Sequence, residues 1–223
     1  MDYKEANISG LKIQYRKWKV RDKIELDKIE LDSNLTTLEK QLRKRNVFVY
    51  NCLKDPVLLD IEQYNYVLSL IREYSLHSPI EFTLECNKCK EQFSVNFKTP
   101  ELITFKDFDF SDIAVSNLKF SLGNISNPDY DRDILNAFSL SERFILDFAY
   151  HVTKVNDKEV KLNDVIEMLQ DLDVDEYQEI FKRYNSQRAI CNFTKTVKCP
   201  KCGLSDLYEF NNLSTFFPQS WSV

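Results

Sequence analysis

The segment Ile80-Glu81-Phe82-Thr83-Leu84-Glu85-Cys86-Asn87-Lys88-Cys89 decides the fold of this 223-residue chain. Apolar and polar side chains alternate up to Cys86, as they do in a β-strand with one buried face. After the second cysteine, Phe93, Val95 and Phe97 alternate with polar residues again. The segment therefore predicts a β-hairpin that carries two thiols at its tip.

A second stretch of the chain repeats this design. Cys199-Pro200-Lys201-Cys202 follows a run that contains Phe193 and Val197, and it precedes Leu207-Tyr208-Glu209-Phe210. Gly203 comes directly after the cysteine pair, where a tight turn often needs a residue at positive φ. We expect a second hairpin with two thiols at its tip.

Two C-x-x-C turns supply the four thiolates of a tetrahedral zinc site. A Cys₄ site formed by Cys86, Cys89, Cys199 and Cys202 would clamp the hairpins together as a zinc ribbon, with the 109 residues 90–198 inserted between its halves. Such a site is closed, so its role is structural, and the metal contributes roughly 10–16 kcal/mol of folding free energy. The predicted cofactor is a structural Zn²⁺.

Three other interpretations of the cysteine pairs stay open, because the separation far exceeds the usual spacing of about 12–20 residues between such pairs. The pairs could be unrelated turns, or a redox C-x-x-C, although that motif belongs in a βαβ setting that neither pair shows. They could also belong to separate metal sites, but His77 and His151 are the only histidines in the sequence that could complete them.

Composition excludes several classes of function. The chain has only 3 glycines, and phosphate-cradling loops depend on glycine, so a Rossmann or P-loop enzyme is excluded. A net charge of −5 disfavours binding to nucleic acid and to anionic lipid. Apolar residues make up 43% of the chain, which is enough for a folded core.

The N-terminal sequence predicts where the protein works. Residues 1–6 are polar and lack the apolar region of a signal peptide, and no stretch approaches the roughly 20 apolar residues of a membrane span. We expect a reducing cytoplasm and no membrane partner. Disulfides rarely persist there, which favours metal binding by the cysteine pairs.

The rest of the chain predicts an α+β fold, with helical bundle-like parts around the zinc-ribbon-like pair of hairpins. The expected elements are an extended arm over 1–20, helices over 22–31, 36–55 and 60–76, a strand over 117–122, one or two helices over 131–152, and helices over 165–169 and 173–184. The expected helix caps are Thr36 with Glu39, Asp60 with Gln63, Asn163, and Asp173 with Glu176.

We expect these elements to form a single compact domain over residues 1–223. Its predicted parts are an N-terminal strand and helices over 1–79, the first zinc hairpin over 80–98, a mostly helical insertion over 99–190, and the second zinc hairpin with a C-terminal tail over 191–223.

The sequence indicates that the protein is not an enzyme. His77 stands at a predicted helix end and His151 at the edge of an aromatic helix, where both are more typical of structural residues. Cys52 and Cys191 lie in apolar contexts typical of buried structural thiols. The numerous carboxylate pairs are typical of a solvated face, and a hydrolase built on one of them is the weakest alternative. No catalytic residue and no small-molecule substrate is predicted.

One segment favours a second function. Residues 15–21, Tyr-Arg-Lys-Trp-Lys-Val-Arg, combine cations with stacking rings, as single-stranded nucleic acids require. The alternative hypothesis is therefore a zinc-ribbon nucleic-acid-binding regulator. The run is short and precedes an acidic stretch, so an ordinary strand with exposed cations accounts for it better. We do not expect nucleic acid to be a partner.

Several segments together resemble a known family. They are Lys12-Ile13-Gln14-Tyr15-Arg16, the 80–89 segment, Lys198-Cys199-Pro200-Lys201-Cys202-Gly203 and Leu213-Ser214-Thr215-Phe216-Phe217. Their order resembles the baseplate hub assembly proteins of T-even-like contractile-tailed bacteriophages, which are also described as hub subunits or hub assembly chaperones. The resemblance implies a non-enzymatic protein whose partners are baseplate hub or tail proteins. It also implies assembly in the host cytoplasm, with a place in the virion tail baseplate as the alternative location.

Overall fold

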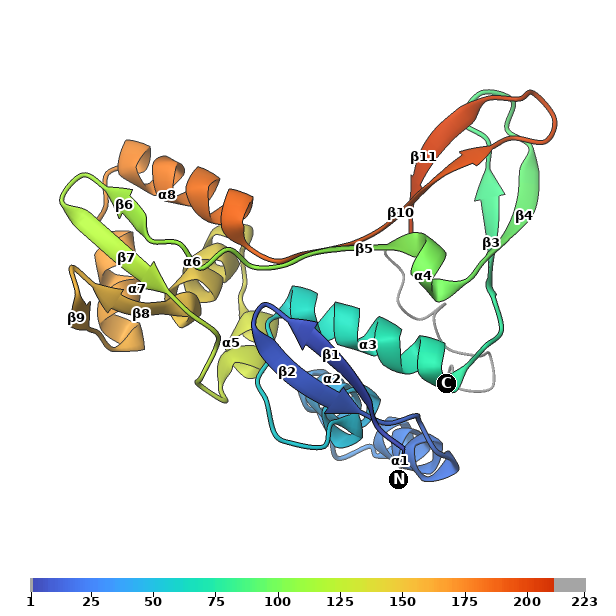
Figure 1. Ribbon diagram of the computed structural model, residues 1–223, viewed down its shortest axis with the longest axis horizontal. Coiled ribbons are helices and arrows are strands. Elements are labelled where there is room, and N and C mark those ends of the chain that lie inside the picture. The colour runs from blue at the N-terminus through green and yellow to red at the C-terminus, as the bar shows by residue number, and fades with distance from the viewer. Residues whose placement is uncertain (1, 211–223) are drawn as a thin grey trace.

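The structure is a computed structural model that describes residues 2–210. Its fold is α+β, and Figure 1 shows three parts. The N-terminal part covers residues 2–79, the insertion lobe covers residues 107–189, and the ribbon combines residues 80–98 with 190–210. In the described range, no helix combines the length and apolar character that crossing a bilayer requires. The single-domain organisation stays a prediction.

The N-terminal part begins with a hairpin rather than a single extended arm. Its elements are β1 (Lys4–Ile8), β2 (Leu11–Tyr15), α1 (Val20–Leu31), α2 (Thr37–Phe48), the short 3₁₀ helix η1 (Tyr50–Cys52) and α3 (Ile61–Ser75). Ser9 and Gly10 form the turn between β1 and β2, with φ of 48° and 79°. Most side chains of β1 are exposed, and its sequence lacks a regular alternation of apolar and polar residues. The sequence pattern therefore predicted only β2.

Helix α2 is shorter than predicted, although its capping box forms as expected. The Thr36 hydroxyl accepts the Glu39 N–H at 3.2 Å, and the Glu39 carboxylate accepts the Thr36 N–H at 2.7 Å. The helix ends at Phe48, η1 follows, and Leu53 and Lys54 then pair with β2. The Lys54 N–H donates to the Gln14 carbonyl at 2.9 Å, so tertiary pairing overrides the helical pattern here.

The insertion lobe combines helices with an antiparallel sheet in the order β6-β7-β8-β9. Its elements are β6 (Ile113–Val115), β7 (Leu118–Leu122), α5 (Tyr130–Asn136), α6 (Leu140–His151), β8 (Val152–Val155), β9 (Lys158–Glu159), α7 (Leu162–Gln170) and α8 (Val174–Gln187). The sequence predicted the helices and β7 but missed the other strands. Strand β8 continues α6 without a break, and its turn to β9 uses Asn156 and Asp157 at φ of 50° and 64°.

Two predicted helix caps differ in the structure. Helix α7 begins after Lys161, so Asn163 lies inside the helix instead of capping it. Asp173 is the N-cap residue of α8, as predicted, but its side chain makes no capping hydrogen bond.

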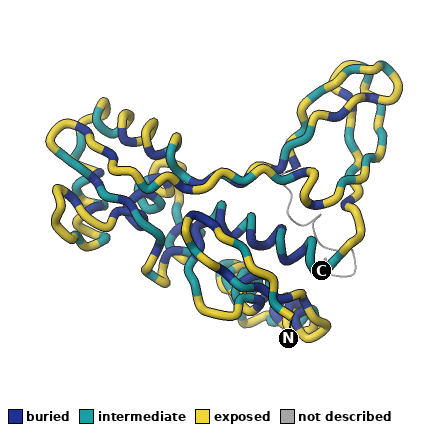
Figure 2. Tube along the Cα trace, in the orientation of Figure 1, coloured by how far each residue is buried: buried dark blue, intermediate teal, exposed yellow. Residues whose placement is uncertain are grey.

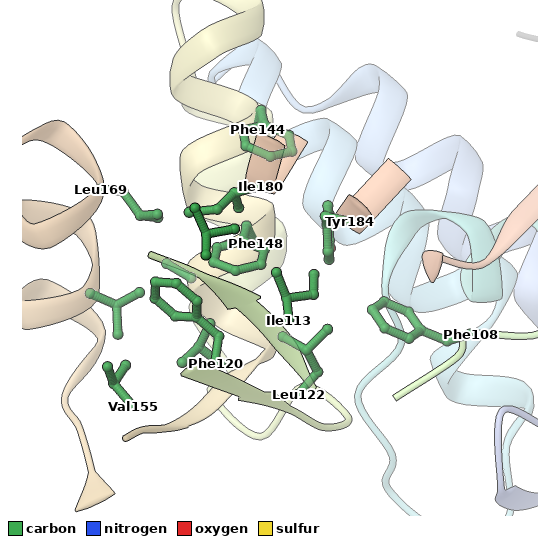
Figure 3. Close-up of a cluster of buried hydrophobic side chains, with 14 of the residues drawn as sticks. Phe108, Ile113, Phe120, Leu122, Phe144, Phe148, Val155, Leu169, Ile180 and Tyr184 are labelled. Carbon is green, nitrogen blue, oxygen red and sulfur yellow. The ribbon is translucent and has the colours of Figure 1, made fainter. Parts of the chain in front are cut away.

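The largest hydrophobic core lies in the insertion lobe, between its sheet and its helices (Figure 3). Phe120 from β7 meets Phe148 from α6 with ring centroids 5.3 Å apart, and Tyr184 from α8 packs edge-on against Phe148 at 5.1 Å. These three side chains are fully buried. A separate core lies in the N-terminal part, where α3 packs against β1 and β2.

The ribbon consists of two hairpins, β3 (Ile80–Glu85) with β4 (Gln92–Phe97) and β10 (Ile190–Lys198) with β11 (Ser205–Glu209), while α4 (Thr99–Leu102) and β5 (Ile103–Lys106) lead out of it. The first half of β10 extends beyond the second hairpin and pairs with a further strand, β5, and the second half pairs with β11. This pairing, together with that of β3 and β4, confirms both predicted hairpins. Figure 1 shows β5 and β10 running side by side between the ribbon and the insertion lobe.

The ribbon has only a thin core. Exposure alternates along β3, β4 and β11, as Figure 2 shows, so each hairpin contributes one face. Phe210 lies 4.4 Å from Phe82 and 5.7 Å from Phe97 between ring centroids, and these aromatics join the two hairpins.

Candidate metal centre

The four predicted cysteines meet at one end of the ribbon. Cys86 and Cys89 lie on the turn between β3 and β4, and Cys199 and Cys202 lie on the turn between β10 and β11. All four sulfur atoms lie within 4.8 Å of one another. The Sγ atoms of Cys86 and Cys202 are 3.5 Å apart, and those of Cys89 and Cys199 are 3.7 Å apart.

These distances fit a tetrahedral metal site. Four thiolates about 2.3 Å from one ion have sulfur–sulfur separations of about 3.8 Å. A disulfide would require about 2.05 Å, and all four thiols are free. The two cysteine pairs therefore form one four-thiol cluster that could hold a single metal ion.

The two cysteine turns have the same backbone geometry. In the first turn, the Cys86 N–H donates to the Glu91 carbonyl at 2.9 Å, and the Lys90 N–H donates to the Cys86 carbonyl at 2.9 Å. Cys199 makes the equivalent pair of bonds to the residues five and four positions ahead, at 2.8 and 3.0 Å. Lys90 and Gly203 occupy the same position of the two turns, with φ of 60° and 73°.

The polar side-chain contacts between the hairpins are exposed. They include Lys201 with Glu91 at 2.7 Å, Asn87 with Asp206, and the Tyr208 hydroxyl with the Glu85 carbonyl at 3.2 Å. Exposed polar pairs contribute about 0–1 kcal/mol each. The hairpins therefore depend on their aromatic contacts and on the four-sulfur site to stay together.

The thiols affect one another's protonation. The backbone N–H groups of Cys89 and Lys88 are directed at the Cys86 sulfur and lower the pKa of this thiol to about 6. For Cys89, the Glu91 N–H acts to lower the pKa, but burial and the neighbouring thiols outweigh it and raise the pKa to about 12. The Cys86 thiolate therefore forms readily, whereas ionisation of Cys89 beside it is opposed, and a cation at this position would favour the thiolate form of both.

The other two cysteines lie outside this site. Burial raises the pKa of Cys52 to about 12, and burial raises the pKa of Cys191 to about 12 as well. Both side chains are buried, as predicted for structural thiols. Within residues 2–210, the four ribbon cysteines are the only group of His, Cys, Asp and Glu side chains placed to hold a metal ion.

The histidines are also away from the cysteine site. His77 is exposed after α3, whereas His151 is buried in the insertion lobe, where Nδ1 donates to the Gly123 carbonyl at 2.8 Å. The core-edge interpretation of His151 from the sequence agrees with this position.

The basic, aromatic segment 15–21 is part of the N-terminal core. The Trp18 ring is buried, and its indole N–H donates to the Phe48 carbonyl at 2.8 Å. The guanidinium of Arg16 is buried as well and pairs with the Asp22 carboxylate at 2.7 and 2.9 Å. The rings on which bases would stack face inward, so this segment does not provide a nucleic-acid site. No pattern in the sequence indicated the Arg16–Asp22 pair.

The fold and the four-thiol cluster define an α+β protein with a zinc-ribbon-like site. The model of the family described as T4 bacteriophage base plate protein matches residues 1–218, and the chain belongs to this family. No curated protein and no solved structure matches the chain. The family match confirms the resemblance to T4-like baseplate proteins. The Leu213–Phe217 segment that contributed to this resemblance lies outside the described residues.

Proposed function

We propose that this baseplate protein acts in the hub, as a hub subunit or as a hub assembly chaperone, and that it works through protein–protein contacts without catalysis. The observation that carries the proposal is the baseplate family match over residues 1–218. The partners would be hub or tail proteins. The protein would act in the host cytoplasm during assembly, before or while it joins the tail baseplate.

The proposed role of the cysteine centre is structural. Zn²⁺ would be held by Cys86, Cys89, Cys199 and Cys202, whose sulfur separations match its tetrahedral geometry. When bound, the ion would neutralise the thiolates and fix the two hairpins relative to each other. Four protein ligands leave no coordination position for water or substrate, which supports a non-catalytic role.

Metal content tests the zinc proposal. The purified chain is expected to hold one zinc ion per protein by elemental analysis, and the Cys86→Ser, Cys199→Ser double variant is expected to hold none. Cys52→Ala is the control, because it removes a buried thiol outside the site and should leave zinc at one per chain. An unchanged zinc content in the double variant would refute the assignment.

Affinity capture tests the hub proposal. A tagged chain expressed during infection is expected to co-purify baseplate hub proteins, identified by mass spectrometry. The Cys86→Ser, Cys199→Ser double variant tests whether the ribbon is needed for these contacts. Recovery of baseplate proteins other than hub components would contradict the hub role while leaving the family membership intact.

A further inference from the structure

A buried carboxylate lies where the N-terminal part meets the insertion lobe. Asp60 is the N-cap of α3, and its Oδ1 accepts the Gln63 N–H at 2.7 Å. Its Oδ2 is buried and has no hydrogen-bond partner among residues 2–210. Across the boundary, Nε2 of His151 at the end of α6 lies 3.8 Å from this Oδ2.

The position of the hydrogen on the neutral His151 ring leaves Asp60 Oδ2 without a donor. Only 1% of the His151 side chain is exposed, and Nδ1 is 2.8 Å from the Gly123 carbonyl. A carbonyl only accepts hydrogen bonds, so Nδ1 carries a hydrogen, and a neutral ring then has a bare Nε2. Without a further proton, two buried acceptors would face each other. Burial of an acceptor that lacks a donor is unfavourable.

The surrounding charges favour retention of a proton. Asp147 on α6 accepts the hydroxyls of Tyr130 from α5 at 2.7 Å and Tyr184 from α8 at 2.9 Å, so it lies close to the pair. Burial raises the pKa of Asp60 to about 6; His151 opposes this rise, and the charge of Asp147 adds to it.

Two further charged groups face the pair. Glu62, on the first turn of α3, also raises the pKa of Asp60. The Arg188 guanidinium lies 3.2 Å from Glu62 and 4.0 Å from Asp147, so it partly neutralises both. A cavity of about 440 Å³ is lined by Asp60 and His151 together with these groups, and it gives the pair a route for proton exchange with solvent.

We propose that Asp60 and His151 hold one proton between Oδ2 and Nε2, and that this proton is a pH-sensitive latch between the N-terminal part and the insertion lobe. With the proton in place, one of the two facing atoms carries a hydrogen, so two bare acceptors no longer face each other across 3.8 Å. When the proton leaves, a carboxylate faces a bare nitrogen, and the contact between α3 and α6 weakens.

The direction of the pH effect follows from linkage. The folded-state pKa of Asp60 is raised, so its contribution is fully present below the ordinary carboxyl pKa of 3.8 and is lost as pH rises through about 6. Between pH 5 and pH 8, this loss increases the unfolding equilibrium constant about tenfold.

The variant Asp60→Asn tests the latch in the full chain. The amide keeps an oxygen to cap α3, and its NH₂ group supplies a permanent donor for Nε2. Denaturant unfolding at pH 5 and pH 8 should show an unfolding constant that rises about tenfold more in the parent protein than in the variant. Titrating groups away from the pair, including the cysteine thiols, are the same in both proteins and cancel.

Asp173→Asn is the matched control, because it makes the same substitution at the exposed N-cap of α8. It should keep the parent pH dependence. An equal pH dependence in Asp60→Asn and the parent protein would overturn the proposal.

NMR gives a second readout that does not depend on a variant. Histidine-selective ¹⁵N labelling yields signals from two residues only, the exposed His77 and the buried His151. His151 Nδ1 should stay protonated, while its Nε2 shift changes between pH 5 and pH 8 as the proton leaves the pair. His151 Nε2 shifts that stay constant from pH 4 to pH 9 would show that the pair holds no shared proton.

Discussion

At the scale of single residues, the two cysteine turns differ in how well their sequences suit their backbone. Gly203 adopts positive φ without strain, whereas Lys90 adopts the same conformation with a side chain that disfavours it. The sequence predicted the glycine turn because glycine marks such positions. The residues around Lys90 carry no comparable signal, and its conformation follows only from its equivalence to Gly203.

This difference predicts opposite effects of two substitutions. Lys90→Gly should raise the free energy of unfolding by up to about 1 kcal/mol, and Gly203→Ala should lower it by about 1 kcal/mol. A Cβ at position 203 would lie 3.7 Å from Lys198 Cε, so the expected cost arises from φ and not from a clash. Denaturant unfolding of the metal-bound proteins measures both. Loss of stability in Lys90→Gly would contradict this prediction.

Some side-chain contacts could not be predicted from the sequence, because the two residues are far apart in the chain. The four ligand candidates were identifiable, since two C-x-x-C turns in one chain are typical of a metal site. The sequence identified Asp60 as a helix cap. Its contact with His151 joins residues 91 positions apart in the chain, and no local sequence pattern indicates such a contact.

At the scale of elements, the repeat Asp22–Leu26 and Asp27–Leu31 shows how an unusual period can still form a helix. Leu26 and Ile29 face inward in α1, whereas Ile24 and Leu31 are exposed. A five-residue step advances the helix by about 500°, so equivalent residues of the two copies fall on different faces. The prediction of a helix with a largely solvated face agrees with this arrangement.

Strands were harder to predict than helices. Helix α3 follows directly from its capping box and its apolar spacing, whereas β1, β6, β8 and β9 are short, and neighbouring strands rather than local pattern stabilise them. The turns Ser9-Gly10 and Asn156-Asp157 were the signals that could have marked them, because such residues tolerate positive φ.

At the scale of the whole molecule, hydrophobic side chains form separate clusters. The insertion lobe has its own core around Phe120 and Phe148, while the ribbon relies on a smaller cluster around Phe193 and Phe210. The small cluster is the one adjoining the cysteine site. Loss of the proposed metal should therefore affect the parts unequally.

Hydrogen–deuterium exchange measures this inequality. Chelation of the metal should strongly accelerate amide exchange in β3, β4 and β11, because their alignment depends on the four sulfurs. Exchange in β7 and α6 should change little, since their core lies in the insertion lobe. Equal acceleration throughout the chain would show that the metal stabilises the molecule as a single cooperative unit.

The 109 residues between the two cysteine pairs also bear on how the protein is made. At about 5–20 residues per second, the ribosome synthesises the second pair roughly 5–20 s after the first. During that interval the early hairpin has only half of its ligands, while the insertion lobe can already fold. Closure of the ribbon would then be a late event in biosynthesis, because a metal ion can bind all four thiols only after Cys202 has been synthesised.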